Sequence, residues 1–158
     1  MRVALLLFSG VALVACESSA IRQPLEFSHR AHAGNGLPCG LCHESFQTSA
    51  FAGMPTTDTC MTCHQSPMSD SAEEEKVREY ANKGEEIPWQ RVYRLPGDTY
   101  FSHRRHVTLA RLDCPECHGD VADSAVPQPR AAVPLTMLRC TGCHAQQAVS
   151  NDCNACHR

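Results

Sequence analysis

The sequence feature that most constrains the fold of this chain is a short motif, Cys-x-x-Cys-His, that occurs five times in 158 residues. The copies occupy residues 39–43, 60–64, 114–118, 140–144 and 153–157. Two cysteines three positions apart can form thioether bonds to the two vinyl groups of one porphyrin, and the histidine that follows then becomes an axial ligand of the iron. The motif therefore predicts five covalently bound haems c, which we number haem 1 to haem 5 in chain order.

The predicted attachment residues follow directly from the motif. The cysteines are Cys39, Cys42, Cys60, Cys63, Cys114, Cys117, Cys140, Cys143, Cys153 and Cys156, and the proximal iron ligands are His43, His64, His118, His144 and His157. Paired cysteines also occur in zinc ribbons and in disulfide-bonded secreted folds, which is the alternative interpretation. Neither requires a histidine directly after the second cysteine, and all five pairs have one, so haem attachment is favoured.

The eleventh cysteine, Cys16, lies outside the motifs. It follows the basic residue Arg2, a short apolar segment and the small residue Ala15, an order typical of a signal peptide and too short for a membrane-spanning helix. Residues 13–16 resemble the lipobox of bacterial lipoproteins, which implies cleavage before Cys16 and attachment of a lipid to its sulfur. The alternative is an ordinary signal peptide with an incidental cysteine. Both predict export to the bacterial periplasm or cell surface, and the first adds a lipid anchor in the membrane.

Chain length limits the kind of core that this protein can form. Residues 16–158 number 143, which leaves about 29 for each motif, far fewer than the roughly 100 of an independent domain. Burial must therefore come largely from the porphyrin faces. We expect a haem-organised, loop-rich chain with a few short helices and almost no sheet. The net charge of −3 disfavours nucleic acid as a partner.

An internal repeat supplies further candidate ligands. Residues 27–32, Phe-Ser-His-Arg-Ala-His, recur as Phe-Ser-His-Arg-Arg-His at residues 101–106, and each copy precedes an attachment motif. The four histidines outside the motifs all lie in these copies: His29, His32, His103 and His106. Two histidines three apart on a helical turn point to the same side. We therefore predict that these four are distal iron ligands.

The repeat also suggests how the chain is organised. The sequence predicts a signal peptide at residues 1–15, a lipid-attached tether at 16–26, a dihaem unit at 27–70, a linker helix and loop at 71–88, and a trihaem unit at 89–158. The helix is expected over residues 71–83, with Ser71 and Glu74 forming a capping box and Gly84 ending the helix.

The order Phe-x-His-x-x-His followed by Cys-x-x-Cys-His resembles the class III multihaem cytochromes c, the cytochrome c3 superfamily. The resemblance implies specific distal ligands. His29 would bind haem 1, at Cys39 and Cys42, and His32 would bind haem 2, at Cys60 and Cys63. In the second unit His103 would bind haem 3 and His106 would bind haem 4.

Haem 5, at Cys153 and Cys156, is where the chain departs from the family pattern. The small trihaem members place a further ligand just before their second attachment motif, and the corresponding stretch here has no histidine but contains Met137. Met137 is the predicted sixth ligand, and methionine with histidine raises the reduction potential of a haem. In the alternative, Met137 only packs on the ring, and the fifth iron is open or is bound by another methionine, which could be Met54, Met61 or Met68.

A closer resemblance covers much of the second half. Residues 87–96, 100–106, 114–119 and 134–137 resemble the pentahaem cytochrome subunit of alternative complex III and related quinol-oxidising complexes. This implies a haem wire that takes electrons from a quinol or an iron–sulfur subunit and passes them to a soluble cytochrome or an oxidase. That subunit is anchored by a membrane helix, whereas this chain offers a signal peptide and Cys16.

Two classes of function are compatible with these patterns. The first is an electron carrier with no catalytic residues of its own. The second is a multihaem reductase in which one open iron acts on a small nitrogen or oxygen substrate. Five proximal histidines, four further histidines and Met137 can fill all ten axial positions, so the sequence favours the carrier.

Overall fold

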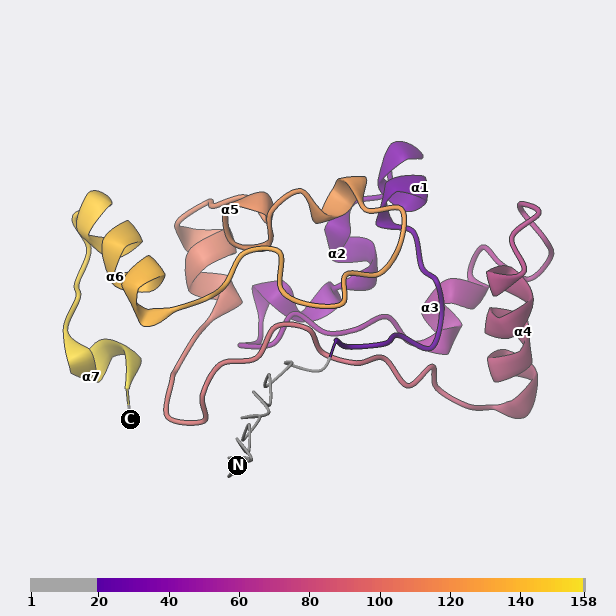
Figure 1. Ribbon diagram of the computed structural model, residues 1–158, viewed down its shortest axis with the longest axis horizontal. Helices are drawn as coiled ribbons and strands as arrows, with labels where there is room; N and C mark the ends of the chain where they lie inside the picture. The colour runs from indigo at the N-terminus through magenta and orange to yellow at the C-terminus, as the bar shows by residue number, and fades with distance from the viewer. Residues whose placement is uncertain (1–19, 158) are drawn as a thin grey trace, which may run out of the picture.

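The computed structural model describes residues 20–157, which form short helices joined by long loops (Figure 1). The helices are α1 (His29–Gly34), α2 (Cys39–Cys42), η1 (Glu44–Gln47), α3 (Thr57–Met61), α4 (Glu73–Lys83), η2 (Arg104–Leu109), α5 (Pro115–His118), η3 (Val121–Asp123), α6 (Met137–Gln146) and α7 (Cys153–Cys156). Within residues 20–157 the strand pairing is limited to one isolated antiparallel bridge, between Thr99 and His157. The predicted fold class is confirmed.

The predicted signal peptide and Cys16 lie outside the described residues. Across residues 20–157, none of the helices combines the length and the apolar character that a bilayer crossing needs. The lipid anchor stays a prediction.

Each attachment motif lies on a helical turn, as the spacing requires. In four of the motifs the backbone N–H of the histidine donates to the carbonyl of the first cysteine, at 3.0 Å for His43, His64 and His118 and at 2.8 Å for His157. The fourth motif lies inside α6. Residues four apart on a helix share a face, so each turn presents its first cysteine and its histidine on the same side.

The linker helix α4 forms where the sequence predicts it but begins two residues later. It starts with three acidic residues, has Lys83 in its last turn, and takes Ala72 as its N-cap. It ends at Gly84, whose φ of 66° lies in the left-handed region that glycine tolerates best.

The predicted capping box is wrong. The Ser71 hydroxyl accepts a hydrogen bond from the Glu73 N–H, but the Glu74 carboxylate does not reach back to Ser71. The Ser71 N–H already donates to the hydroxyl of Ser69, at 3.2 Å. Glu74 instead accepts from the Ser69 hydroxyl at 2.6 Å and from the Met68 N–H at 2.7 Å. Residues of the turn before the helix, rather than Ser71, thus supply the donors to the Glu74 carboxylate.

Buried apolar side chains are few. Leu25, Val77 and Ile87 are the buried hydrophobic residues of the described chain. They form one small cluster where α4 meets the segment after it, with Met61 and Trp89 packed against its edge. A cluster of this size cannot hold the whole chain together by itself. Burial by porphyrin faces stays a prediction.

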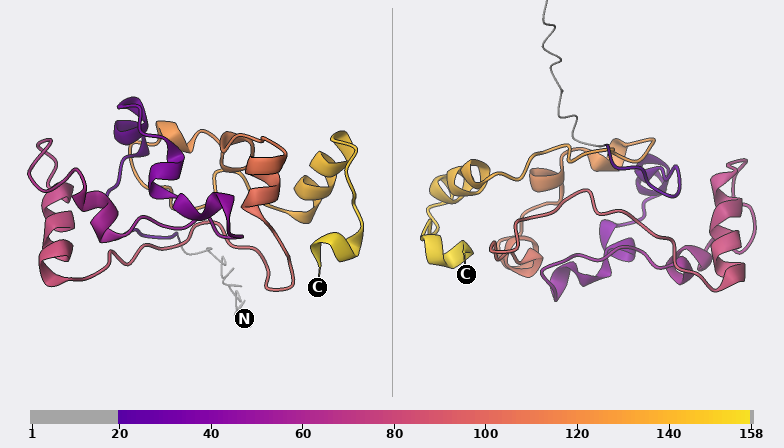
Figure 2. Two further views of the ribbon diagram at one scale, coloured as in Figure 1. Left: turned by 180° about the vertical axis from the view of Figure 1, so that it is seen from behind. Right: turned by 60° about the horizontal axis from the view of Figure 1, so that its bottom comes forward.

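The chain is elongated, with α4 at one end and α6 and α7 at the other (Figures 1 and 2). Between these ends the two halves of the sequence interleave rather than follow one another. Helix α1 packs against η3, and the Arg30 N–H donates to the carbonyl of Ser124 at 3.0 Å. Helix η1, from the first half, likewise packs against η2, from the second half. The segments predicted to form the dihaem and trihaem units are therefore in contact.

Candidate functional site

We call the four histidines outside the attachment motifs, His29, His32, His103 and His106, the spare histidines. Three of them face a motif histidine across a short gap. The ring centroids of His32 and His64 are 6.0 Å apart, those of His103 and His118 are 6.3 Å apart, and those of His106 and His144 are 6.1 Å apart. An imidazole nitrogen binds a first-row metal at about 2.0 Å, so two rings that bind one ion from opposite sides have centroids about 6 Å apart. The three gaps match this requirement.

The fourth spare histidine, His29, lies near His43. Burial lowers the pKa of His29, and the neighbouring His43 and then His32 lower it further. The Nδ1 atom of His29 is buried without a hydrogen-bond partner. Burial also lowers the pKa of His118, followed by the effects of His103 and His43. In both residues the lowered pKa favours the neutral imidazole, which is the form that binds metals.

Backbone carbonyls set the orientation of most of these rings. Nδ1 of His32 lies 2.9 Å from the Ser28 carbonyl oxygen and Nδ1 of His106 lies 2.8 Å from that of Ser102. The corresponding contacts are His43 with Gly53 at 2.8 Å, His103 with Ala50 at 2.6 Å, and His144 with Ser150 at 2.9 Å. A carbonyl oxygen only accepts, so Nδ1 carries the proton and Nε2 keeps its lone pair for a metal.

The two copies of the repeat build the same local structure. Phe27 stacks on His32 at 4.4 Å and meets His29 edge-on at 4.9 Å. Phe101 stacks on His106 at 4.6 Å and meets His103 edge-on at 4.8 Å. Each phenylalanine thus supports both histidines of its copy. The sequence pattern identified these phenylalanines as part of the repeat but did not reveal this role.

The attachment cysteines are available for thioether bonds. All ten are free thiols rather than disulfides. Within residues 20–157 no group of three or more His, Cys, Asp or Glu side chains converges as a metal site would require. Facing imidazoles, free cysteine pairs and sparse apolar packing together fit a porphyrin with two axial ligands, and they do not fit a zinc ribbon.

Cysteines of the first motif lie near cysteines of the second and third motifs. Burial raises the pKa of the Cys60 thiol, and the nearby Cys42 raises it further. Burial likewise raises the pKa of Cys114, and Cys39 adds to the effect. The motif of haem 1 therefore lies beside those of both haem 2 and haem 3. The His103 ring, from the second half, is bonded to Ala50 in the first half, which places the same two parts together.

The motifs of haem 3 and haem 4 are also neighbours. The pKa of Cys117 is raised by burial, lowered by Arg139, and raised again by Cys143 and Cys140. Arg139 donates to the Glu116 carbonyl at 2.6 Å, which ties α6 to α5.

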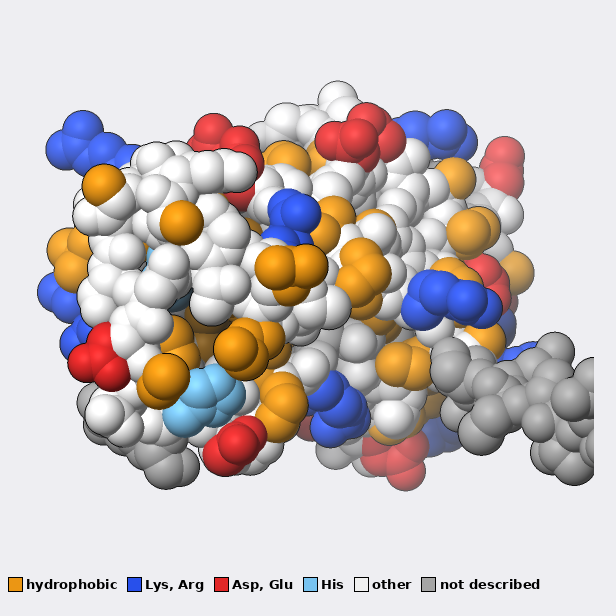
Figure 3. Space-filling view, turned by 60° about the vertical axis from the view of Figure 1, so that its left-hand side comes forward, with side chains coloured by type: hydrophobic (Ala, Val, Ile, Leu, Met, Phe, Trp, Pro, Cys, Tyr) orange, Lys and Arg blue, Asp and Glu red, His pale blue; other side chains and the backbone are white. Residues whose placement is uncertain are grey.

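The region of haem 5 is the most exposed of the candidate sites. His157 lies 3.8 Å from the exposed carboxylate of Asp98, and the Tyr100 N–H donates to the Cys156 carbonyl at 2.6 Å. Met137 is the first residue of α6, and it is 71% exposed. Figure 3 shows separate apolar side chains scattered over the face at this end, with a histidine exposed among them. Ligation of haem 5 by Met137 stays a prediction.

Two further residues near the rings were not found from the sequence. Tyr93 meets the His118 ring edge-on at 4.4 Å and its hydroxyl donates to the His118 carbonyl at 3.3 Å. Glu74, expected only to cap a helix, lies 3.5 Å from Nδ1 of His64. Neither position carries a local sequence signal, because both act on a histidine distant in the chain.

Comparisons with known proteins agree with the haem interpretation. Residues 31–125 match a family model described as cytochrome c3, and residues 99–158 match one described as cytochrome c7 and related cytochrome c. The chain is also 33% identical over 156 residues to the menaquinone reductase multihaem cytochrome c subunit of Nitratidesulfovibrio vulgaris. That alignment covers 85% of this chain and 74% of the relative.

Proposed function

Since the chain belongs to the class III multihaem cytochromes c, which bind haem c covalently, we propose that it is an exported, membrane-anchored electron carrier with five haems. Haem supplies a one-electron couple whose potential depends on the axial ligands and their surroundings. The polypeptide contributes attachment, ligation and spacing. The observation that carries the proposal is the set of three facing histidine pairs, each joining a repeat histidine to a motif histidine.

The proposed ligands follow these pairs. His32 and His64 would hold haem 2, His103 and His118 haem 3, and His106 and His144 haem 4. Their separations of 6.0, 6.3 and 6.1 Å support this assignment. His29 with His43 is proposed for haem 1, and Met137 with His157 for haem 5.

We further propose that electrons pass along the order haem 2, haem 1, haem 3, haem 4. The approach of Cys42 to Cys60, of Cys39 to Cys114, and of Cys117 to Cys143 supports it. Haem 5 would follow haem 4, because its motif comes directly after α6. Electrons would thus cross between the two halves of the chain through haems 1 and 3.

The likeness to a menaquinone reductase subunit supports a place in a quinol-linked complex. The proposed partners are a quinol-oxidising or iron–sulfur subunit on one side and a soluble cytochrome or an oxidase on the other. Cys16 would carry the lipid that holds the chain at the membrane, in the periplasm or at the cell surface.

A reductase with an open iron is the second candidate. It is favoured by one observation: the four spare histidines lie beside other motifs, and Met137, the remaining candidate for haem 5, is 71% exposed. In that case haem 5 would be the substrate site.

Two measurements on the exported holoprotein test these proposals. Mass spectrometry should find five haem adducts, and fewer than five would contradict the haem count. Electron paramagnetic resonance of the oxidised protein should show five low-spin irons, whereas a high-spin signal from one iron would favour the reductase. His32→Ala should convert one fifth of the iron to high spin, and His106→Ala should do the same for a different haem. No change in either variant would refute the ligand assignment.

A further inference from the structure

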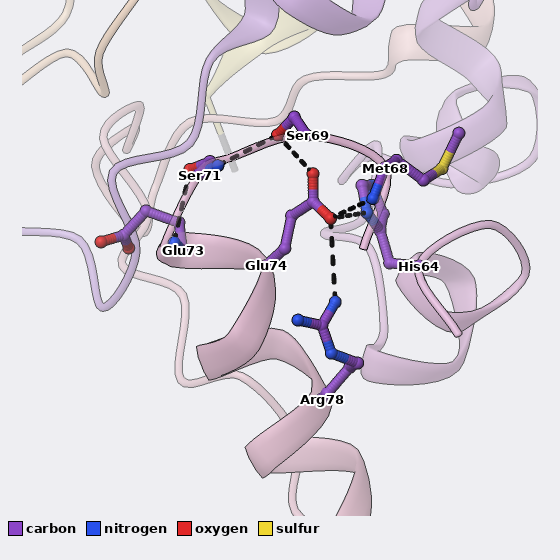
Figure 4. A network of polar contacts seen from close by, with 7 residues as sticks. All are labelled: His64, Met68, Ser69, Ser71, Glu73, Glu74 and Arg78. Atoms are coloured by element: carbon purple, nitrogen blue, oxygen red, sulfur yellow. Dashed lines mark hydrogen bonds and ion pairs between the residues drawn. The ribbon is translucent and has the colours of Figure 1, made fainter. Parts of the chain in front are cut away.

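Glu74 differs from the other charged side chains of the described chain because it is buried. Only 8% of the residue is exposed, and the other charged residues in positions 20–157 all have more contact with solvent. Its carboxylate lies at the start of α4, where the preceding turn folds over it (Figure 4). A buried carboxylate needs hydrogen-bond donors or a cation to compensate for lost water.

Donors surround this carboxylate. The Ser69 hydroxyl donates to Oε1 at 2.6 Å, and the Met68 N–H donates to Oε2 at 2.7 Å. The Arg78 guanidinium lies 3.7 Å from Oε2. These two hydrogen bonds and the nearby cation stabilise the ionised form of the carboxylate. The group is therefore a fixed negative charge at neutral pH.

This charge faces one particular iron ligand. Oε2 of Glu74 lies 3.5 Å from Nδ1 of His64, at the outer limit of a hydrogen bond, and this buried nitrogen has no other partner among the described residues. His43 and His144 instead direct Nδ1 to neutral carbonyl oxygens. Haem 2 is thus set apart by a buried charged group behind its proximal ligand, since the carboxylate near His157, that of Asp98, is exposed.

We propose that Glu74 lowers the reduction potential of haem 2 by acting through His64 as a positioning residue with a fixed charge. The inference rests on the proposed function, since it requires a haem at Cys60 and Cys63. An anion behind a ligating imidazole makes the ligand more basic and stabilises the more positive, oxidised iron. Glu74 itself gains and loses no electron or proton in this one-electron couple.

The expected effect is large because the group is shielded from solvent. The Glu74 carboxylate, placed behind the His64 ring, would attract the extra positive charge of the oxidised iron. In a partly buried site this attraction changes the equilibrium constant for reduction by about 10- to 100-fold. A tenfold change in a one-electron couple corresponds to about 59 mV. Asp98 offers a matched comparison, because it lies 3.8 Å from Nδ1 of His157 but is 68% exposed, so that water and salt screen its charge.

The test is a redox titration of the holoprotein carrying Glu74→Gln, with Asp98→Asn as the control. Glutamine keeps the size of the side chain and one accepting oxygen. We expect one midpoint potential to rise by at least about 59 mV, with smaller changes in the other four. The haem methyl resonances of one haem should shift in the magnetic resonance spectrum. Asp98→Asn should move no midpoint by a comparable amount.

A second variant separates a charge effect from a merely structural one. Arg78→Gln removes the cation that partly neutralises Glu74, so we expect the same midpoint to fall. Potentials that stay at their original values in both variants, or that move in the same direction in both, would overturn the inference. If Glu74→Gln loses haem, Arg78→Gln alone decides by the sign of its shift. Mass spectrometry of the unmodified protein distinguishes the two levels of failure. Five haems there, with unchanged potentials in the variants, refute only the role of Glu74, whereas a haem missing at Cys60 in the unmodified protein refutes the proposed function.

Discussion

Thr57 is the first residue of α3, and it joins this helix to the segment after α4. Its side chain is buried, with 3% exposed. The hydroxyl donates to the Glu85 carbonyl at 2.8 Å and accepts from the Ile87 N–H at 3.1 Å. The hydroxyl thus holds two backbone groups that lie 28 and 30 residues away in the chain.

Thr57→Val should destabilise the holoprotein by about 2–4 kcal/mol. Valine fills nearly the same volume, so the cavity contribution is small. The change leaves the buried Ile87 N–H without its partner, at a cost of about 1–3 kcal/mol. It also removes the part-buried bond to the Glu85 carbonyl, which is worth about 1 kcal/mol. Since small domains are stable by about 5–15 kcal/mol, the loss should be easily measured.

Thr62→Val is the matched control. Thr62 is exposed and lies in the attachment motif that follows Thr57 in the chain. Its hydroxyl bonds only to the Thr59 carbonyl of the preceding turn and to the Cys63 sulfur. Water can replace those bonds, so we expect a change within about 0.5 kcal/mol. Guanidinium unfolding of both oxidised holoproteins, followed by circular dichroism, gives the two free energies of unfolding. Equal losses in the two variants would refute the argument that burial of the Thr57 hydroxyl is what matters.

Three further predictions concern haem attachment, pH and ring support. Replacing the ten motif cysteines with serine should remove most of the helical circular dichroism signal, because only Leu25, Val77 and Ile87 form a buried apolar cluster in the described chain; a native-like spectrum would contradict this. Hydrogen bonds from Lys76 and from the Glu26 N–H lower the pKa of Glu73 below its ordinary 4.5. Its contribution to stability should therefore be present above that pH and be lost in more acidic solution, so acid should shift the denaturant midpoint less in Glu73→Gln than in the unmodified protein. Phe101→Leu should weaken ligation by His103 and His106, because it removes aromatic pairing worth about 0.5–1.5 kcal/mol; the effect should be seen as high-spin iron at haems 3 and 4 but not at haem 2.

The parts of the site that sequence could predict are those that depend on neighbours in the chain. The attachment cysteines and proximal histidines follow from a five-residue motif, and α4 follows from its acidic start and Gly84. The capping box failed because Ser69 and Met68, in the turn before α4, donate to the Glu74 carboxylate, while the Ser71 N–H donates to the Ser69 hydroxyl. Which donor binds the Glu74 carboxylate depends on where the donors lie in three dimensions. The spacing of Ser71 and Glu74 in the sequence does not give those positions.

The sequence alone determined the haem chemistry of this protein, because thioether attachment and proximal ligation need only a cysteine pair and a histidine on one helical turn. The tertiary structure alone decided which distant groups share a site: His32 opposite His64, Cys39 beside Cys114, and Glu74 beside the His64 ring. These contacts join residues that are separated by loops without periodic pattern. Their positions result from how the whole chain packs, so no local pattern records them.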